Sequence, residues 1–311
     1  MKEQKYFEIY YFAKYIRKIE TAIANHYDFS DIRCPIHLSI GQELVAASFS
    51  AVFEIEDQVF SSHRSHAHYF AKNGNLEKFI HEIHGKIDGC SSGLGGSMHL
   101  IDLPANFLGS TAIVSNSIPI AVGAALGNKI NRSKHLVFSF FGDAATEEGV
   151  FFESLNFASL KKLPMVFVCE NNSKSVYTDI SERQPSDRNN CAIAKSLGLK
   201  AYRLNEKNPI TFIEELISLM AEVRDTLEPT YVEIDTSLMV EHCGPRYEID
   251  LEKDPLEILR EKLLEKDIKK MQSLDESLKL IDHELLSAFD SAHLSNYISM
   301  REASEFVYAK K

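Results

Sequence analysis

HLVFSFFGDA at residues 135–144 and PMVFVCENN at residues 164–172 are the two stretches of this sequence that indicate its fold most clearly. Each is an apolar run of strand length that ends in small or polar residues. The 26 residues between Ala144 and Asn171 are enough for a turn, a crossover helix and the return of the chain as a neighbouring parallel strand. The spacing therefore predicts an α/β fold with both polar ends at one edge of a mostly parallel sheet.

The segment between these two strands has the pattern of a helix. Residues 147–163 carry apolar side chains at helical spacing, with charged residues at both ends. Asp143 and Asn172 then lie at the edge where open α/β sheets bind ligands. A carboxylate, an amide oxygen and nearby main-chain carbonyls suit a magnesium ion shared with a phosphate group. An ordinary turn containing a carboxylate and an asparagine would give the same two signals.

Five short motifs occur in the order in which one enzyme family has them. They are IGQE at residues 40–43, HRSH at residues 63–66, GGSMH at residues 95–99, IPIAVG at residues 118–123 and the Gly-Asp/Asn-Asn pair. On these motifs the chain resembles the thiamine diphosphate family. More narrowly, it resembles the alpha subunit of the decarboxylating component of 2-oxo acid and acetoin dehydrogenase complexes. The resemblance implies a thiamine diphosphate-binding fold, with helices flanking the sheet.

The resemblance also implies which residues contact the cofactor. They are His63, Arg64, Val114, Gly142, Asp143, Ala144, Ala145, Asn172 and Lys174. Among them, Asp143, Asn172 and the main-chain carbonyl of Lys174 would hold Mg²⁺. Val114 would lie beneath thiamine diphosphate, although a valine here would also suit an ordinary core. A guanidinium such as that of Arg64 binds phosphate oxygens through two parallel charge-assisted hydrogen bonds.

Two histidines are the catalytic candidates implied by the resemblance. His242, in EHCGP at residues 241–245, matches a mobile-loop histidine that assists proton or acyl transfer, and an ordinary pKa of about 6.5 suits that work. An exposed loop histidine is the alternative. His99 ends the GGSMH motif, where we expect it to line the substrate path or to serve a structural role.

Two other histidine patterns could indicate metal sites. His63, His66 and His68 are close in sequence, but no nearby cysteine or acidic residue offers a fourth zinc ligand. HEIH at residues 81–84 has its histidines three apart, whereas the metalloprotease helix needs them four apart. We therefore expect residues 81–84 to form a solvated helix face.

Three positions depart from the family pattern. Ala144 replaces the third motif glycine, which is harmless if its φ is negative. Leu238 stands where the family generally has arginine, and Arg246 stands where aspartate is common. The last two changes weaken the expectation that a standard lipoyl domain docks here and point to a divergent branch.

The resemblance implies that this chain is half of an enzyme. The glutamate that activates the cofactor would come from a beta subunit, in an assembly of two alpha and two beta chains. The expected reaction cleaves a C–C bond beside a carbonyl of a 2-oxo acid or acetoin-like substrate. The fragment would pass to a lipoyl group on an acyltransferase component or to another acceptor. The alternatives are half of a transketolase-like carboligating enzyme and a non-catalytic paralogue that stabilises a partner.

Composition narrows the class of protein. The chain has 311 residues, 44% of them apolar, and a formal net charge of −11 without a basic cluster, which argues against nucleic acid as a partner. No interior run approaches the roughly 20 apolar residues that span a bilayer, so we expect no membrane partner. Five scattered cysteines and the lack of a secretory signal predict a cytoplasmic protein.

The composition changes near residue 250. Residues 1–250 are predicted to form the cofactor-binding α/β domain, beginning with an amphipathic helix at about residues 6–24. Residues 251–311 are predicted to be a helical extension. Its first helix should begin with Asp254 as N-cap, Pro255 as first helical residue and Glu257 as the acid of a capping box.

Overall fold

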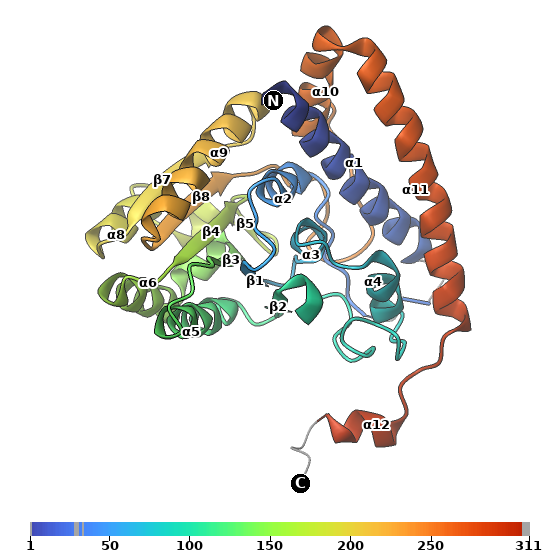
Figure 1. Ribbon diagram of the computed structural model, residues 1–311, viewed down its shortest axis with the longest axis horizontal. Coiled ribbons are helices and arrows are strands. Elements are labelled where there is room, and N and C mark those ends of the chain that lie inside the picture. The colour runs from blue at the N-terminus through green and yellow to red at the C-terminus, as the bar shows by residue number, and fades with distance from the viewer. Residues whose placement is uncertain (1, 28–30, 33, 307–311) are drawn as a thin grey trace.

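The computed structural model describes residues 2–27, 31–32 and 34–306, and its centre is a parallel sheet (Figure 1). In the described residues the main sheet has six strands in the order β2-β1-β3-β4-β8-β7, and every neighbouring pair is parallel. Its strands are β1 (Gln58–Ser61), β2 (Phe107–Ser110), β3 (Val137–Gly142), β4 (Met165–Asn171), β7 (Lys200–Asn205) and β8 (Thr230–Asp235). The predicted parallel α/β fold is confirmed.

The helices cover both faces of this sheet and extend beyond it. They are α1 (Lys2–Tyr27), α2 (Glu43–Ser50), α3 (His66–Ala71), α4 (Leu76–Ile83), α5 (Ser117–Ile130), α6 (Gly149–Lys161), α7 (Ile180–Arg183), α8 (Asn190–Ser196), α9 (Pro209–Thr226), α10 (Pro255–Lys266), α11 (Ile268–Leu294) and α12 (Met300–Glu305). Short 3₁₀ turns, η1 (Leu103–Ala105) and η2 (Asp143–Glu147), and a small hairpin, β5 (Lys174–Ser175) with β6 (Thr178–Asp179), complete the described elements. Among the described residues, no helix combines the length and apolar composition needed to cross a membrane.

Alternate residues of the strands pack into two hydrophobic cores. Phe138 and Phe140 of β3 point to the core shared with α1, α2 and α9, whereas Val137 and Phe141 point to the core shared with α5, α6 and α8. Because successive side chains of a strand face opposite sides, a sheet buried on both faces has apolar residues at nearly every position. This explains why the sequence shows continuous apolar runs at residues 135–141 and 164–169.

The strand–helix–strand unit forms as the spacing predicts. In β3 and β4, Gly142 pairs with Glu170, so Asp143 and Asn171 leave the sheet at the same edge. The crossover helix α6 lies within the predicted residues 147–163, and η2 connects it to β3. Asp143 and Asn172 therefore follow adjacent strands.

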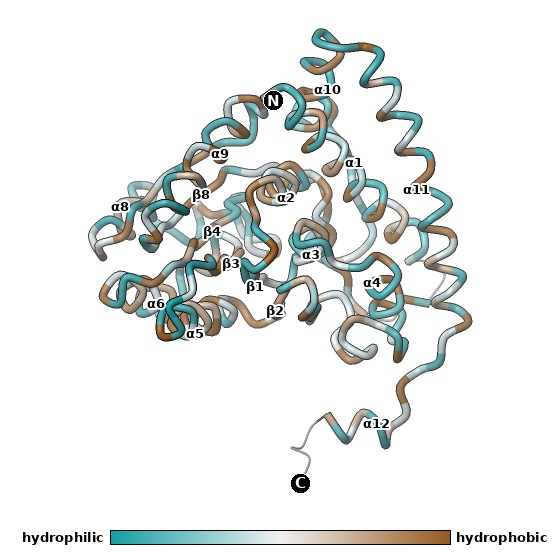
Figure 2. Tube along the Cα trace, in the orientation of Figure 1, coloured by the Kyte–Doolittle hydropathy of each residue, from teal (hydrophilic) through white to brown (hydrophobic). Residues whose placement is uncertain are grey.

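The C-terminal helices pack on the N-terminal one. Residues of α10 and α11 share a hydrophobic cluster with α1, and α11 also packs on α4. Hydrophobic and hydrophilic segments alternate along α1 and α11, which lie side by side (Figures 1 and 2). The domain boundary near residue 250 stays a prediction, and residues 307–311 of the predicted extension lie outside the described residues.

The start of α10 confirms part of a local prediction. Asp254 is the N-cap and accepts a hydrogen bond from the Leu256 N–H, and Pro255 is the first helical residue. The Glu257 carboxylate, however, accepts a hydrogen bond from Lys14 of α1 at 3.1 Å rather than closing a capping box. Packing of α10 on α1 offers this acid a cationic partner that the local sequence did not reveal.

The HEIH segment is buried, which corrects the expectation of a solvated face. His81, Glu82 and His84 are each at most 4% exposed because α11 covers α4. Glu82 accepts hydrogen bonds of 2.7–3.0 Å from four backbone N–H groups of the glycine-rich loop, at Ser91, Gly93, Gly95 and Gly96. A buried carboxylate needs such donors, so Glu82 organises the loop.

Candidate active site

A cavity lies at the carboxyl edge of the sheet, and most strands contribute to it. The residues that follow β1, β2, β3, β4 and β8 all reach its wall. Its lining residues are His37, Gln42, Ser62, His63, Arg64, Met98, Ala112, Val114, Ser115, Phe141, Gly142, Asp143, Ala144, Ala145, Glu170, Asn172, Lys174, Ser175, Val176, Leu238 and His242. The structure thus gathers in one cavity every residue expected to contact the cofactor.

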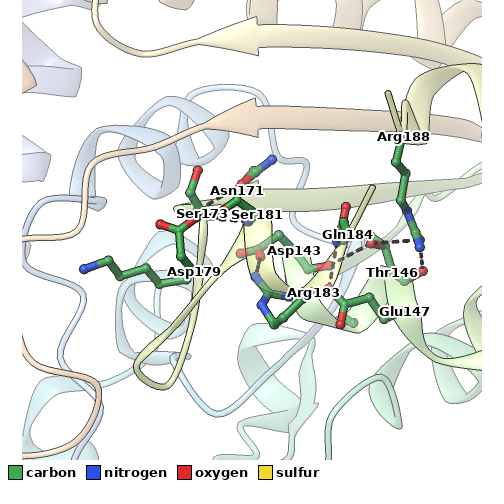
Figure 3. Close-up of polar contacts among 12 residues, drawn as sticks. Asp143, Thr146, Glu147, Asn171, Ser173, Asp179, Ser181, Arg183, Gln184 and Arg188 are labelled. Carbon is green, nitrogen blue, oxygen red and sulfur yellow. Dashed lines mark hydrogen bonds and ion pairs between the residues drawn. The ribbon is translucent and has the colours of Figure 1, made fainter. Parts of the chain in front are cut away.

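Asp143 begins η2 and is almost completely buried. Its side chain forms an ion pair with Arg183 at the end of α7, and Arg183 also pairs with Glu147 (Figure 3). Burial raises the pKa of the Asp143 carboxyl, and the Arg183 guanidinium offsets part of that rise. The Arg183 guanidinium therefore occupies the place beside the Asp143 carboxylate that a metal cation would take.

The two asparagines after β4 have different environments. Asn171 is buried and donates to Glu233 at 2.8 Å, so it has a structural position. Asn172 lines the cavity, and its Oδ1 accepts the Lys174 N–H at 3.0 Å in a tight turn. Asn172 and Lys174 thus join Asp143 in the cavity wall. These oxygen atoms are of the type that Mg²⁺ prefers.

Ala144 needs no glycine at its position. It lies within η2 and is absent from the residues with positive φ in the described chain. An alanine in a helical conformation has no steric penalty. The departure from the Gly-Asp-Gly pattern is therefore compatible with the turn.

The loop after β8 is held against the segment before α2. The Met239 N–H donates to the Ile40 carbonyl, and the Gly244 N–H donates to the Ile36 carbonyl, each at 3.0 Å. Gly41 permits this contact: its φ is +100°, and a Cβ there would lie 2.4 Å from the Ser237 carbonyl oxygen. The pairing brings His242 over the cavity.

Three histidines meet at this end of the cavity. The ring centroids lie 4.8 Å apart for His37 and His63, 5.0 Å for His37 and His242, and 5.3 Å for His63 and His242. Burial, with the nearby positive charge of Arg64, lowers the pKa of both His37 and His63 to about 3 and also lowers the pKa of His242. All three imidazoles are therefore neutral at pH 7.

Arg64 connects the segment before α2 with the loop after β8. Its guanidinium donates to the Leu38 carbonyl, and its Nη2 donates to the His242 carbonyl at 3.2 Å. Burial lowers the pKa of Arg64 to about 10, so the side chain stays charged at neutral pH. Arg64 therefore positions the backbone of His242 and also supplies positive charge to the cavity.

Local sequence patterns do not predict a role in the cavity for His37 or Glu170, and Gln42 is recognisable only as part of the IGQE motif. Nothing in residues 174–183 indicates the contact of Arg183 with Asp143. The only signal for His37 is its position four residues before Gly41. A single histidine at that distance indicates no particular site without a structure.

His99 lies apart from the other predicted site residues. Its side chain is exposed, and Met98 lines the cavity in its place. The GGSMH segment is fixed by hydrogen bonds to Glu82, so neighbouring side chains of the loop point in different directions. The catalytic role of His99 stays a prediction that this arrangement does not support.

The possible zinc site of His63, His66 and His68 does not assemble. His66 has Glu20 and Ser97 2.7 Å from its two ring nitrogens. Ser61 Oγ lies 2.9 Å from Nδ1 of His68, and Glu170 lies 3.1 Å from its Nε2. Both ring nitrogens of His66 thus have partners, and Nδ1 of His68 has one. Of this set, only His63 lines the cavity.

Comparisons with known proteins give the family of the chain. The family model described as "Dehydrogenase E1 component" matches residues 11–207. The chain is 30% identical over 293 residues to a pyruvate dehydrogenase E1 component subunit alpha of Rickettsia bellii, covering 90% of both chains. It is also 30% identical over 306 residues to the mitochondrial subunit alpha-1 of Oryza sativa subsp. japonica, covering 95% of this chain and 77% of that relative.

A solved structure of another protein has a similar fold. The transketolase of Campylobacter jejuni matches 99% of this chain with a TM-score of 0.60 at 15% identity. The chain spans about half of that protein, 51% of its length. At this level of identity the match supports the fold alone.

Proposed function

Because the chain belongs to the dehydrogenase E1 component family, we propose that it is the alpha subunit of a thiamine diphosphate- and Mg²⁺-dependent enzyme. The enzyme cleaves the C–C bond beside the carbonyl of a 2-oxo acid or acetoin-like substrate. The observation that carries this proposal is the meeting of Asp143 and Asn172 with His63 and His242 in one cavity. The names of the relatives make pyruvate the first substrate to test.

The oxygen-rich end of the cavity suits a magnesium diphosphate. Asp143, Asn172 and the main-chain carbonyl of Lys174 would hold Mg²⁺, and phosphate and water oxygens would complete its shell. The ion pair of Asp143 with Arg183 supports this assignment, because it places a cation beside the proposed ligand. When bound, thiamine diphosphate supplies a carbanion that adds to the substrate carbonyl and then accepts the electron pair of the broken bond.

The histidine-rich end would act on the substrate. A neutral imidazole accepts a proton at one nitrogen and donates one at the other, so His242 would transfer protons to and from the substrate. The pKa of His63 is about 3, so its imidazole is a weak base at pH 7 and would act as a hydrogen-bond partner. In this proposal, Arg64 holds the loop after β8 in place by donating a hydrogen bond to the main-chain carbonyl of His242. Val114 offers an apolar wall beneath the cofactor. Leu238, also in the wall, excludes water where the family generally has arginine.

A second chain would complete the site. The exposed side chains of Ile113, Val114 and Ile120 form an apolar surface at the start of α5. Farther along the helix, a Cβ at Gly123 or Gly127 would meet no described atom within 4 Å apart from those of its chain neighbours and of the backbone of α5. A helix of another chain could therefore approach closely. This surface supports a beta subunit that supplies the activating glutamate, in an assembly of two alpha and two beta chains. The fragment would pass to a lipoyl group of an acyltransferase or to another acceptor.

Native mass spectrometry of the chain purified from its own host, with Mg²⁺ in the buffer, tests this assembly. We expect a heterotetramer that carries thiamine diphosphate and releases CO₂ from pyruvate or a related 2-oxo acid. Formation of a new C–C bond without a lipoyl acceptor would favour a carboligating enzyme instead. A cofactor-free homo-oligomer would contradict the proposal.

Calorimetry of the same complex tests the cofactor site. Asp143→Asn should weaken the binding of Mg²⁺ and thiamine diphosphate by about 100-fold or more, because the buried metal would lose its charged ligand. Asp235→Asn is the matched control, since Asp235 ends β8, which β4 separates from β3 in the sheet, and pairs with Arg203 outside the cavity. Equal cofactor affinity in the Asp143 variant and this control would overturn the assignment.

A further inference from the structure

Three segments that are far apart in the sequence place imidazoles around one point. His37 comes from the segment before α2, His63 follows β1, and His242 lies in the loop after β8. Each offers a ring nitrogen, and these three nitrogens lie within 4.8 Å of one another. In the described part of the chain, no other group of histidine, cysteine, aspartate and glutamate side chains converges in this way.

The imidazole of His37 is buried without a complete set of partners. The residue is only 6% exposed, and its Nδ1 has no hydrogen-bond partner among the described residues. A buried polar nitrogen without a partner is destabilising. Burial and the charge of Arg64 also lower the pKa of His37 and His63 to about 3, so protons do not compete for their lone pairs at neutral pH. These nitrogens are available to a ligand.

The spacing of the rings suits a tetrahedral cation. A Zn–N bond of about 2.0–2.1 Å and tetrahedral angles place ligating nitrogens about 3.3 Å apart and ring centroids about 5 Å apart. The observed centroid separations are 4.8, 5.0 and 5.3 Å. Rotation about the side-chain bonds can therefore bring the three nitrogens together without moving the rings far.

We propose that His37, His63 and His242 form a binding site for one transition-metal cation of the Zn²⁺ or Co²⁺ class. Water would take the fourth position, which three-histidine sites commonly leave open. Arg64 opposes the added charge, whereas the carboxylates of Glu170 and Glu20, which interact electrostatically with Arg64, favour it. Imidazole ligands select Zn²⁺ and Co²⁺ over Mg²⁺, so this site is chemically distinct from the oxygen ligands around Asp143.

Occupancy of this site has a consequence for the cavity. A metal bound to the three imidazoles would remove their lone pairs from any substrate in the same space. Zn²⁺ would therefore block the histidine-rich end of the cavity, whereas Mg²⁺ would not. This inference does not require the proposed function, because it depends only on the three side chains.

Titration with CoCl₂ alone tests the site. The full chain, together with any subunit that copurifies, is first freed of metal by a chelator. We expect one Co²⁺ per chain with the intense visible absorption of a four-coordinate ion, unaffected by excess Mg²⁺ and displaced by Zn²⁺. His37→Ala, His63→Ala and His242→Ala should each weaken binding at least tenfold.

Two control variants make the result specific. His135→Ala removes an imidazole just before β3, far along the chain from the three ligands, and should leave the spectrum unchanged. Asp143→Asn should also preserve it. Circular dichroism identifies any variant that fails to fold, and His63→Gln replaces His63→Ala in that case. Only weak octahedral absorption, or equal Co²⁺ affinity in the histidine variants and the wild type, would overturn the proposal.

Discussion

The two ends of the cavity differ in the atoms that they present. Near β3 and β4, Asp143 and Asn172 offer oxygen atoms, and the carboxylate has an arginine partner. Near β1 and the loop after β8, His63 and His242 offer neutral imidazoles, joined by His37. Oxygen ligands suit Mg²⁺ and phosphate-linked charge, whereas imidazoles suit proton transfer and transition metals. The same edge of the sheet thus carries one region suited to anchoring a cofactor and another suited to reaction chemistry.

The largest expected effect is that of a substitution at His242, which should lower turnover but hardly change cofactor binding. His242→Asn should lower the turnover number of the assembled enzyme by about 10²–10⁴-fold, since it removes a general acid–base group. Its affinity for the cofactor should change less than about threefold. Single-turnover kinetics and calorimetry on the same sample measure both quantities. A His242→Asn enzyme that lost cofactor affinity as strongly as Asp143→Asn would erase the distinction between the two ends.

The second largest effect is expected from breaking the ion pair between Arg183 and Asp143. Arg183→Gln leaves the buried Asp143 carboxylate without its cation, so the metal-free protein should lose about 1–3 kcal/mol of stability. The same change removes a competitor for the carboxylate, so the affinity for Mn²⁺ should rise about threefold or more. Thermal unfolding and electron paramagnetic resonance measure these effects. Arg203→Gln is the control, and weaker Mn²⁺ binding than in that control would show that Arg183 assists the metal.

The neutral imidazoles make stability depend on pH. The pKa of His37 is about 3 in the folded chain and about 6.5 when unfolded, so the unfolded chain binds more protons between these values. Stability should therefore fall as pH decreases from 6.5 toward 3. His37→Asn should reduce the slope of the unfolding free energy against pH by up to about 1.4 kcal/mol per pH unit, which corresponds to the uptake of one proton on unfolding. Urea unfolding at several pH values measures it, and an unchanged slope relative to His135→Asn would contradict the assignment.

The smallest effect concerns the departure from the family motif. Ala144→Gly restores the usual glycine in η2, where the backbone does not need one. The extra freedom of glycine in the unfolded chain should cost about 0.5–1 kcal/mol of stability. Cofactor affinity should stay unchanged. Tighter cofactor binding in this variant would mean that the alanine methyl group crowds the diphosphate.

Local patterns in the sequence predicted much of the fold. The apolar runs before Asp143 and Asn172, with 26 residues between the motifs, predicted two adjacent parallel strands and their helix correctly. The Asp254-Pro255 pair predicted the start of α10. These features depend on neighbours in the chain, through side-chain periodicity, caps and the length of a crossover. The same reasoning missed the burial of His81 and His84, because α11, which covers them, lies some 200 residues farther along the chain.

Local spacing in the sequence predicts that Asp143 and Asn172 share the carboxyl edge of the sheet, because parallel connections bring each strand end to the same side. The meeting of these residues with the three histidines depends on tertiary contacts. β1 and β8 are separated in the sheet by β3 and β4, yet His63 and His242 are neighbours. The loop after β8 pairs with residues 36–40 and thereby crosses the edge. This contact depends on the packing of two loops that are far apart in the sequence, so the spacing of residues within either loop does not predict it.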